Sequence, residues 1–427
     1  MKPKHILSIA LCCACLLPMQ AQTTREEMKA NPAQTGGVYL AYPTDIPAQT
    51  PAPKGYKPFY ISHYGRHGSR YLIGDRDYKW VLDLFAAAHR SAALTPLGED
   101  VYGRLQQVWA EAEGHGGDLS PLGVRQHRGI AERMFRSFPE VFKGTPVISA
   151  RSTVVLRCAM SMAAFGDRLK ELNPGLRISY EASQKYMDYL NYHSEESNRF
   201  TSLTDGPCAE EYRKFKEERT RPDRLVASLF SDADFIRKQV NPGELMWGLY
   251  WIASDMQNME TPLSFYDLFE PDELFALWET FNYHFYIGNA NHADGHNLVI
   301  DNAKPLLKNI LDSADEAIAN GGTAATLRFG HDGNVIPLVA LMQIENFGVF
   351  TADADSLYTL WTDFKVVPMA GNLQLIFFRN TKKGQEDDIL VKILHNEREV
   401  HIPVATDRFP YYRWADVEAF YRQVLGE

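Results

Sequence analysis

Two arginines flank a histidine at residues 66–70, which read Arg-His-Gly-Ser-Arg at the end of a short apolar and aromatic run. The neutral imidazole of His67 has a nitrogen lone pair near pH 7 and can attack phosphorus directly. The guanidinium groups of Arg66 and Arg70 match the oxygens of a phosphoryl group by paired hydrogen bonds, and we expect Gly68 to let the backbone approach the anion closely. The cluster suits a phosphate ester, although the same residue types also occur together on solvated surface loops.

A second polar turn, at residues 327–334, follows another apolar run and contains His331 and Asp332. The carboxyl ends of strands in open α/β sheets meet at the edge where these proteins bind ligands. If the two runs are neighbouring strands, His331 would donate to the phosphoryl oxygens and Asp332 would protonate the leaving alcohol, which is worth about 10²–10⁴-fold in rate. Alone, a His-Asp pair is more typical of an ordinary polar turn, so its role depends on the first cluster.

A third basic segment, residues 151–157, joins a predicted strand to a predicted helix. Arg157 would project from the first turn of that helix, whose N-terminus also favours an anion. Arg151 is a second candidate for phosphate contact and is equally suited to a surface ion pair.

Together, these segments resemble the histidine acid phosphatases, the two-domain branch of the histidine phosphatase superfamily that includes phytases and multiple inositol polyphosphate phosphatases. The resemblance runs from residue 58 to the C-terminus and includes residues 119–126, which are similar to the family's leucine-threonine-x-x-glycine segment, with Ser120 in the threonine's place. It implies a covalent phosphohistidine on His67, Asp332 as general acid, and no metal or other cofactor. It also implies four phosphate-binding residues: Arg66, Arg70, Arg157 and His331.

Two features differ from the family's pattern. Tyr71 and Leu72 follow the first cluster, where the family often has a proline, so the wall on the substrate side is expected to differ. The inositol polyphosphate branch often carries His-Ala-Glu at the acid position, whereas this chain has His-Asp-Gly at residues 331–333. The acid motif therefore does not follow that branch, although the chemistry is unchanged.

Strand-like and helix-like segments alternate on both sides of a long helical stretch. We expect strands at residues 145–150, 323–329, 373–379 and 389–396, and helices at residues 78–93, 95–113, 120–138, 153–172, from 335, and 414–425. This alternation is typical of a layered α/β/α domain with a mostly parallel sheet. Residues 183–308 have many aromatic residues and almost no strand pattern, which predicts an inserted, mainly helical cap domain. The α/β domain would comprise residues 58–182 and 309–427, after a lead-in at residues 22–57 that runs over the surface.

Residues 1–21 have the pattern of a secretory signal peptide, because Lys2 and Lys4 precede an apolar stretch at residues 6–17 that is too short to span a bilayer. We expect cleavage near Ala21 and no membrane contact afterwards, with an uncleaved anchor as the alternative. The formal net charge is −10, and −12 without this segment, which does not suit a nucleic-acid partner. An anionic substrate would need a local positive pocket.

The remaining cysteines and histidines do not indicate a second catalytic or metal site. Cleavage leaves Cys158 and Cys208, and whether they form a disulfide stays open. His284 and residues 292–296 could suggest a metal site, but Gly295 and the neighbouring asparagines indicate a loop that either lines the cleft or lies on the surface. No thiolate or second carboxylate nearby completes a zinc-type set, so we expect no metal.

The leading interpretation is a secreted or periplasmic phosphomonoesterase acting on a small-molecule phosphate monoester. The resemblance favours inositol phosphates such as phytate. Arg76 and Lys79 would meet additional phosphates, unless they are simply a solvated helix start. A phosphomutase and a phosphoanion-binding protein without turnover are the alternatives, and the leaving group, the pH optimum and the oligomeric state stay open.

Overall fold

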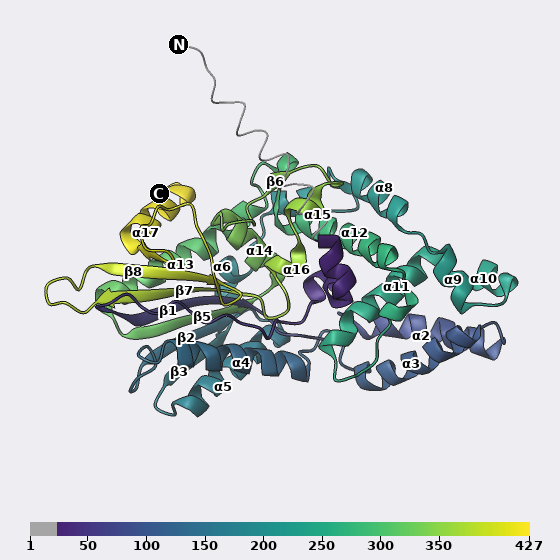
Figure 1. The fold of residues 1–427 in the computed structure, drawn as a ribbon, viewed down its shortest axis with the longest axis horizontal. Coiled ribbons are helices and arrows are strands. Elements are labelled where there is room, and N and C mark those ends of the chain that lie inside the picture. Colours follow the sequence, from purple (N-terminus) through teal and green to yellow (C-terminus); the bar gives the residue numbers. More distant parts are fainter. Residues whose placement is uncertain (1–23) are drawn as a thin grey trace, which may run out of the picture.

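An eight-stranded sheet forms one half of the molecule and a group of helices forms the other (Figure 1). The computed structural model describes residues 24–427, so the expected signal peptide lies outside the described residues. The strands are β1 (Tyr56–Arg66), β2 (Val147–Ser152), β3 (Arg177–Ala182), β5 (Thr323–Gly330), β7 (Asn372–Asn380), β8 (Ile389–His395), β9 (Arg398–Glu399) and β10 (Tyr411–Arg413). Their order is β10-β8-β7-β1-β5-β2-β3, with β9 paired to β8.

The strands that carry the predicted site lie side by side in the middle of the sheet. β1 and β5 are parallel, with Ile61 opposite Ala325 and Arg66 opposite Gly330, so both strands end at the same edge. β2 continues the parallel arrangement beside β5, and β3 beside β2. The late strands β7, β8 and β10 extend the sheet on the other side of β1 in antiparallel register. The predicted α/β class, with a mostly parallel central sheet, is confirmed.

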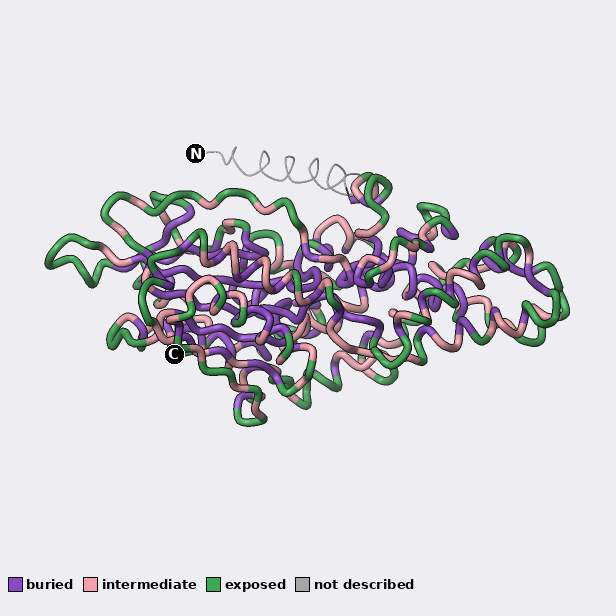
Figure 2. The backbone as a smooth tube through the Cα atoms, turned by 90° about the horizontal axis from the view of Figure 1, so that it is seen from below, coloured by how far each residue is buried: buried purple, intermediate pink, exposed green. Residues whose placement is uncertain are grey.

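Helices cover both faces of the sheet. On one face lie α4 (Pro121–Ser137) and α5 (Leu156–Leu172), where Ile130 and Phe165 pack with Ile148 and Leu327 of the strands. On the other lie α13 (Lys304–Asn320), α14 (Asp332–Leu341) and α17 (Trp414–Leu425). The burial pattern follows these layers: the central strands β1, β5, β7 and β8 are buried along most of their length, whereas the edge strand β3 and the loop between β7 and β8 are largely exposed (Figure 2).

Two helices begin where their sequence predicts, at a hydroxyl residue followed by proline. The side chain of Thr95 accepts from Gly98 N–H at the start of α3 (Pro96–Ala112), and Ser120 does the same for Gly123 N–H at the start of α4. A hydroxyl acceptor at this position satisfies an otherwise unpaired amide, and proline in the first turn has no amide to satisfy. These caps fix the ends of two helices near the site.

The helical half draws on two separate parts of the chain. It contains α7 (Glu195–Phe200), α8 (Ala209–Arg219), α9 (Asp223–Leu229), α10 (Ala233–Gln239), α11 (Pro242–Asp255) and α12 (Pro271–Asn289). The short helix α6 (Met187–Leu190), which we expect in the cap, lies against α13 and β5 of the sheet half instead. The helical half also contains α2 (Asp75–Arg90) and α3, which we had assigned to the α/β domain; they pack on α11 and α9 instead (Figure 1). Val81 and Phe85 of α2 share a core with Leu249 and Ile252 of α11, which explains the placement.

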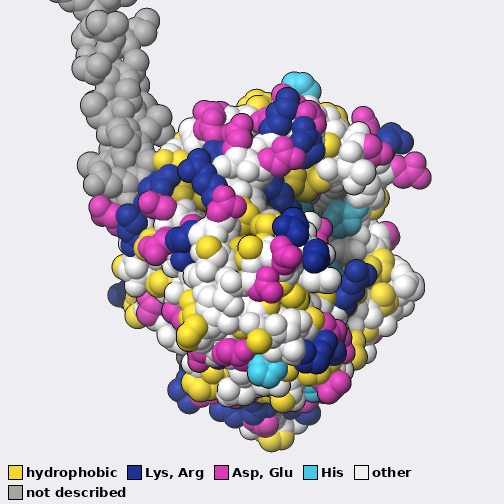
Figure 3. Space-filling model, turned by 90° about the vertical axis from the view of Figure 1, so that its right-hand side faces the viewer, with side chains coloured by type: hydrophobic (Ala, Val, Ile, Leu, Met, Phe, Trp, Pro, Cys, Tyr) yellow, Lys and Arg dark blue, Asp and Glu magenta, His cyan; other side chains and the backbone are white. Residues whose placement is uncertain are grey.

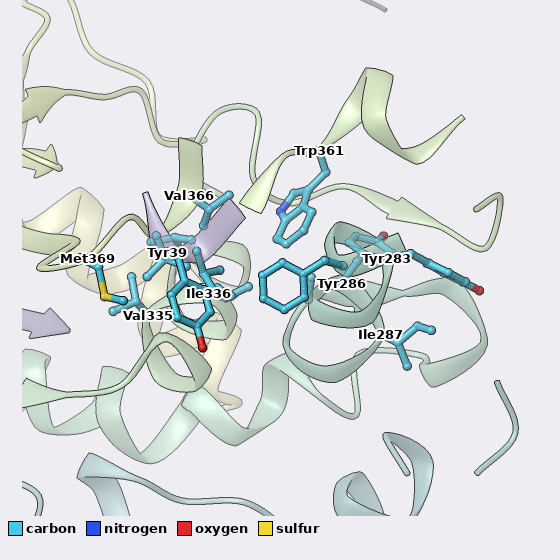
Figure 4. Packing of buried hydrophobic residues seen from close by; sticks show 14 of the residues in the cluster. Tyr39, Tyr283, Tyr286, Ile287, Val335, Ile336, Trp361, Val366 and Met369 are labelled. Carbon is cyan, nitrogen blue, oxygen red and sulfur yellow. The ribbon is translucent and has the colours of Figure 1, made fainter. Parts of the chain in front are cut away.

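The expected surface position of the lead-in is wrong for its middle part, while residues 43–57 do lie at the surface. The short helix η1 (Pro32–Tyr39) packs on α11, α12 and α16 (Asp363–Val366), and the backbone from Thr35 to Tyr39 is buried. Tyr39 lies in the apolar cluster of Figure 4, with Val366 and Met369 nearby. The sequence of η1 has no amphipathic periodicity, so nothing in its pattern indicates that this segment is buried.

Short elements complete the chain. They are β4 (Asn291–His292), which pairs with β6 (Phe350–Thr351), and α15 (Leu357–Leu360). Among the described residues, no helix combines the length and the apolar character needed to cross a bilayer.

Candidate active site

His67 lies directly after β1, at the sheet edge where β1 and β5 end. Its backbone N–H donates to Gly330 O at 2.9 Å, and its side chain is 2% exposed. Nδ1 lies 2.9 Å from Gly68 O. Because a carbonyl only accepts, Nδ1 carries the proton and Nε2 keeps the lone pair. Burial, followed by the charges of Arg66, Arg70 and Arg157, lowers the pKa of His67 well below its usual value, so the imidazole is neutral and nucleophilic.

Gly68 is required by packing, a constraint that adds to its expected role of letting the backbone approach the anion. A Cβ at this position would lie 2.6 Å from the carbonyl oxygen of Gly123 in the first turn of α4. Ser120 N–H donates to Ser69 O at 2.9 Å, and Ser69 N–H donates to the Gln126 side chain at 2.8 Å. Residues 119–126 therefore support the turn that carries His67.

Arg66 is fully buried and connects three segments. Its Nη1 donates to Val38 O at 2.5 Å and to Val367 O at 2.9 Å, and its Nη2 forms an ion pair with Asp332 Oδ2 at 2.8 Å. The guanidinium is therefore held in one orientation by the backbone, with Asp332 as its counter-charge.

Asp332 begins α14, and His331 immediately precedes it. Burial favours the neutral form of Asp332, but Arg66, His331 and Arg70 outweigh this effect and lower its pKa. The rings of His331 and His67 are 5.9 Å apart between centroids. Burial lowers the pKa of His331 to about 4, against the opposing effect of Asp332. In the resting site Asp332 is therefore ionised and His331 is neutral.

Arg157 lies in the first turn of α5, as predicted, and adds its charge to that of Arg66 and Arg70. Burial and the nearby Arg70 lower the pKa of Arg157. Among the described residues, no hydrogen-bond acceptor is within reach of the buried Nε atoms of these three arginines. The charges of all three arginines act on His67, so we call these residues a cationic cup. Buried donors of this kind require acceptors. A phosphoryl group has oxygen acceptors suited to them.

Several residues around the cup were not found from the sequence. The hydroxyl of Tyr39 lies 3.3 Å from Arg70 Nη2, and its ring lies 4.9 Å from the guanidinium carbon. Asp255 and Asn258 are fully buried behind the turn. No local motif marks any of these three, because only the packing of the helical half brings them to the site.

Other candidates lie outside the cup. Arg151 forms an ion pair with Glu181 at 3.2 Å, and Lys79 pairs with Asp83. Arg76 lines a groove in the helical half. Cys158 and Cys208, the cysteines among the described residues, are buried free thiols.

The loop at residues 291–296 has a neighbour that the sequence did not indicate. Cys208, His292 and Asp294 each offer an atom within 4.8 Å of the other two, so a thiol does lie beside this loop. His292 Nδ1 accepts from Asp294 N–H at 3.3 Å, which leaves the ring proton on Nε2, directed at Cys208 Sγ 4.0 Å away. Burial raises the pKa of the Cys208 thiol to about 11 and lowers the pKa of His292, so the thiol keeps its proton and the imidazole is neutral.

Known proteins with related sequences and folds are phosphatases. A curated relative, multiple inositol polyphosphate phosphatase 1 of Gallus gallus, is 20% identical over 404 residues, which are 87% of this chain and 83% of the relative. A crystal structure of the Bifidobacterium longum multiple inositol polyphosphate phosphatase with inositol hexasulfate gives a TM-score of 0.76 at 20% identity, covering 90% of this chain and 97% of that one. The phytase from D. castellii gives a TM-score of 0.66 at 12% identity, covering 92% and 84%.

The family match covers both polar turns and the basic segment between them. Residues 65–396 match the family across most of the chain, from Gly65 beside the nucleophile turn to Asn396 after β8. The chain belongs to the histidine phosphatase superfamily (branch 2) and is a phosphatase.

Proposed function

We propose that the protein is a phosphomonoesterase that hydrolyses inositol phosphates through a phosphohistidine at His67. The observation that carries this proposal is the cationic cup, in which Arg66, Arg70 and Arg157 have unpaired buried donors and act by their charges on a neutral imidazole. Positioned donors of this kind stabilise the charge that develops on phosphoryl oxygens during transfer. The names of the relatives support the substrate class.

The reaction has two steps. Nε2 of His67 forms a bond to phosphorus while the bond from phosphorus to the ester oxygen breaks, and protonated Asp332 gives its proton to the departing alkoxide. Water then attacks phosphorus, Asp332 accepts the water's proton, and the bond between nitrogen and phosphorus breaks to release inorganic phosphate. Asp332 returns to its protonated state, so one carboxyl group serves both steps.

The resting ion pair between Asp332 and Arg66 sets a requirement for the first step. The acid must be protonated, whereas its pKa is lowered in the empty cup. A bound phosphate brings negative charge next to Asp332 and competes for Arg66, and both effects raise the carboxyl pKa. Substrate binding therefore prepares the acid, and activity is expected to be higher in acidic solution.

A groove in the helical half supports a substrate with several phosphates. It has a volume of about 840 Å³, and its lining includes the cations Arg76, Arg213 and Lys216 beside Trp251, together with the acids Asp77, Glu217 and Glu244. Trp251 lies 6.1 Å from Tyr39 between ring centroids, and Tyr39 contacts Arg70, so the groove is adjacent to the cup. The helical end of the molecule is hollowed, with Lys and Arg side chains around the hollow (Figure 3). These cations suit the peripheral phosphates of an inositol polyphosphate.

Lys216 gives a test of this substrate class. Its Nζ lies 4.7 Å from the ring centre of Trp247, and burial lowers its pKa. Lys216→Met should reduce kcat/KM for inositol hexakisphosphate by about tenfold, the effect of one charge-assisted contact, and leave p-nitrophenyl phosphate unchanged. Lys214→Met is the matched control, because Lys214 lies on the same helix and pairs with Glu210. Equal loss on both substrates would contradict the assignment.

Trapping the intermediate distinguishes an enzyme from a binding protein. Protein mixed with ³²P-labelled substrate and denatured within milliseconds at alkaline pH, where a phosphoramidate survives, should retain label on residue 67. His67→Ala should retain none and lose turnover. A phosphoanion-binding protein would bind ligand with no label and no turnover, and a phosphomutase would pass the label to a second acceptor instead of water.

Export is the remaining part of this proposal. Its support is the sequence of residues 1–21, in which two lysines precede an apolar stretch. Mass spectrometry of the protein from a host that exports it should give a mature N-terminus near Gln22. An intact Met1 on the exported protein would contradict cleavage.

A further inference from the structure

Asp255 is a buried acid behind the nucleophile turn that the proposed mechanism does not use. It is the last residue of α11 and is fully buried. A carboxylate is unfavourable at the negative end of a helix and unfavourable when removed from water. A residue with both disadvantages requires a local reason, and its hydrogen bonds supply one.

Both oxygens of Asp255 accept hydrogen bonds that lead to the turn. Tyr78 Oη donates to Oδ2, and Tyr78 in turn accepts from Leu72 N–H at 2.8 Å. Asn258 Nδ2 lies 3.3 Å from Oδ1. We call each of these two hydrogen-bond chains an arm. The arm through Tyr78 reaches the backbone of Leu72, two residues after Arg70.

The second arm reaches the other side of the same arginine. Asn258 accepts from Ser69 Oγ at 2.7 Å and donates to Tyr39 O at 3.0 Å. Tyr39 contacts Arg70 through its hydroxyl and its ring. Asp255 thus accepts from Tyr78 and Asn258, and these two side chains contact the backbone after Arg70, Ser69 before it, and the backbone of Tyr39.

We propose that Asp255 is a positioning residue that fixes Arg70 in the orientation needed to bind the phosphoryl group, an inference that rests on the proposed role of Arg70. Asp255 forms no ion pair with Arg70 among the described residues, so it acts through Tyr78, Asn258 and their partners. An ionised carboxylate offers only acceptors, and both arms require acceptors. An amide at residue 255 would present a donor to one arm and release it.

The pKa of Asp255 decides the pH at which the experiment is done. Burial raises its pKa to about 7, against the lowering effects of Tyr78, Arg70 and Asn258. Tyr71 and Tyr266 also face it. Measurements at pH 8 therefore examine the form that accepts at both oxygens.

The test is the affinity for inorganic phosphate, measured by calorimetry, which needs no turnover. Asp255→Asn should weaken phosphate binding about tenfold. In an Arg70→Lys background, the same substitution should change affinity by less than about twofold, because residues that act through one partner are not additive. Glu279→Gln is the control: it removes another buried acid of the helical half, one paired with Arg219 at 2.7 Å, and should leave affinity unchanged.

Each remaining outcome has a definite meaning. Equal weakening in both backgrounds, no weakening, or tighter binding through loss of a negative charge would overturn the positioning role while leaving the cup in place. Failure of the unaltered protein to bind phosphate would overturn the proposed function itself. If Asp255→Asn does not fold, Tyr78→Phe replaces it, because this variant removes the hydrogen bond from Tyr78 and keeps the carboxylate. Tyr78→Phe should weaken phosphate binding severalfold only where Arg70 is present.

Discussion

Replacing Asp332 with asparagine should slow turnover by a factor that depends on the leaving group. An inositol alkoxide leaves poorly without a proton, so loss of the acid should reduce kcat by about 10²–10⁴-fold. The p-nitrophenolate ion leaves readily unprotonated, so the loss with p-nitrophenyl phosphate should be about tenfold or less. The ratio of the two losses measures proton donation separately from any general damage to the cup.

The same variant has a stability cost that the structure bounds. The ion pair between Asp332 and Arg66 is 2.8 Å long, with side chains 24% and 0% exposed. Removing one partner of a fully buried pair costs about 3–5 kcal/mol. Here Asp332 is partly exposed, and in the variant Arg66 would keep its hydrogen bonds to the carbonyl oxygens of Val38 and Val367. We therefore expect a decrease of about 1–2 kcal/mol in the free energy of unfolding, which leaves the variant folded.

The assays are steady-state kinetics on both substrates at pH 5 and urea unfolding of each protein. Asparagine also removes a negative charge beside the phosphate, so the inhibition constant for inorganic phosphate should fall. A loss of kcat that is equal on both substrates would refute the role of Asp332 as acid and leave it only as the partner of Arg66. An unchanged kcat would refute any catalytic role.

Three further substitutions test the surroundings. Gly68→Ala places a Cβ 2.6 Å from a backbone carbonyl of α4, so kcat should fall by more than about 100-fold. The control is Gly103→Ala, which has open space around it. This control should keep its activity, and thermal unfolding should show a free energy of unfolding higher by about 0.5–1 kcal/mol. Tyr39→Phe removes the hydroxyl near Arg70 but keeps the ring, so the inhibition constant for phosphate should rise about two- to fivefold. Burial raises the pKa of Asp363 to about 6; the stability that its neutral form contributes is complete below about pH 4 and is lost as the pH rises towards 6. Urea unfolding from pH 4 to 7 should therefore give a shallower decline for Asp363→Asn than for the unaltered protein, and parallel curves would contradict this.

The residues of the candidate site could be predicted because their signal is local. Each lies in a short polar turn directly after an apolar run, and the rule that parallel strands end at one edge brings His67 and Asp332 together. Arg157 follows from its place in the first turn of a helix. The family resemblance then assigned roles that spacing alone leaves open. The packing role of Gly68 was missed because its neighbour, Gly123, lies 55 positions away on another helix.

The helical half was predicted less well, for a physical reason. An amphipathic helix specifies that one face is buried but not against which partner. The apolar faces of α2 and α3 fit the sheet or the helical half equally well by pattern, and only three-dimensional packing decides. Tyr39 and Asp255 belong to the same class, because a tyrosine in a segment without periodicity and an acid at the end of an apolar helix have no local signature of function.

The cup explains why so much charge is buried at one sheet edge. Arg66, Arg70 and Arg157 lose hydration, and Asp332 is the one acid paired directly with them among the described residues. Such an arrangement is unfavourable by itself, but it prepares donors that need no reorganisation when phosphate arrives. The same charges keep His67 neutral, since a protonated imidazole would add a fourth cation. In the proposed mechanism, one electrostatic condition would therefore bind the anion, keep the nucleophile neutral and, once phosphate displaces Asp332 from Arg66, supply the acid.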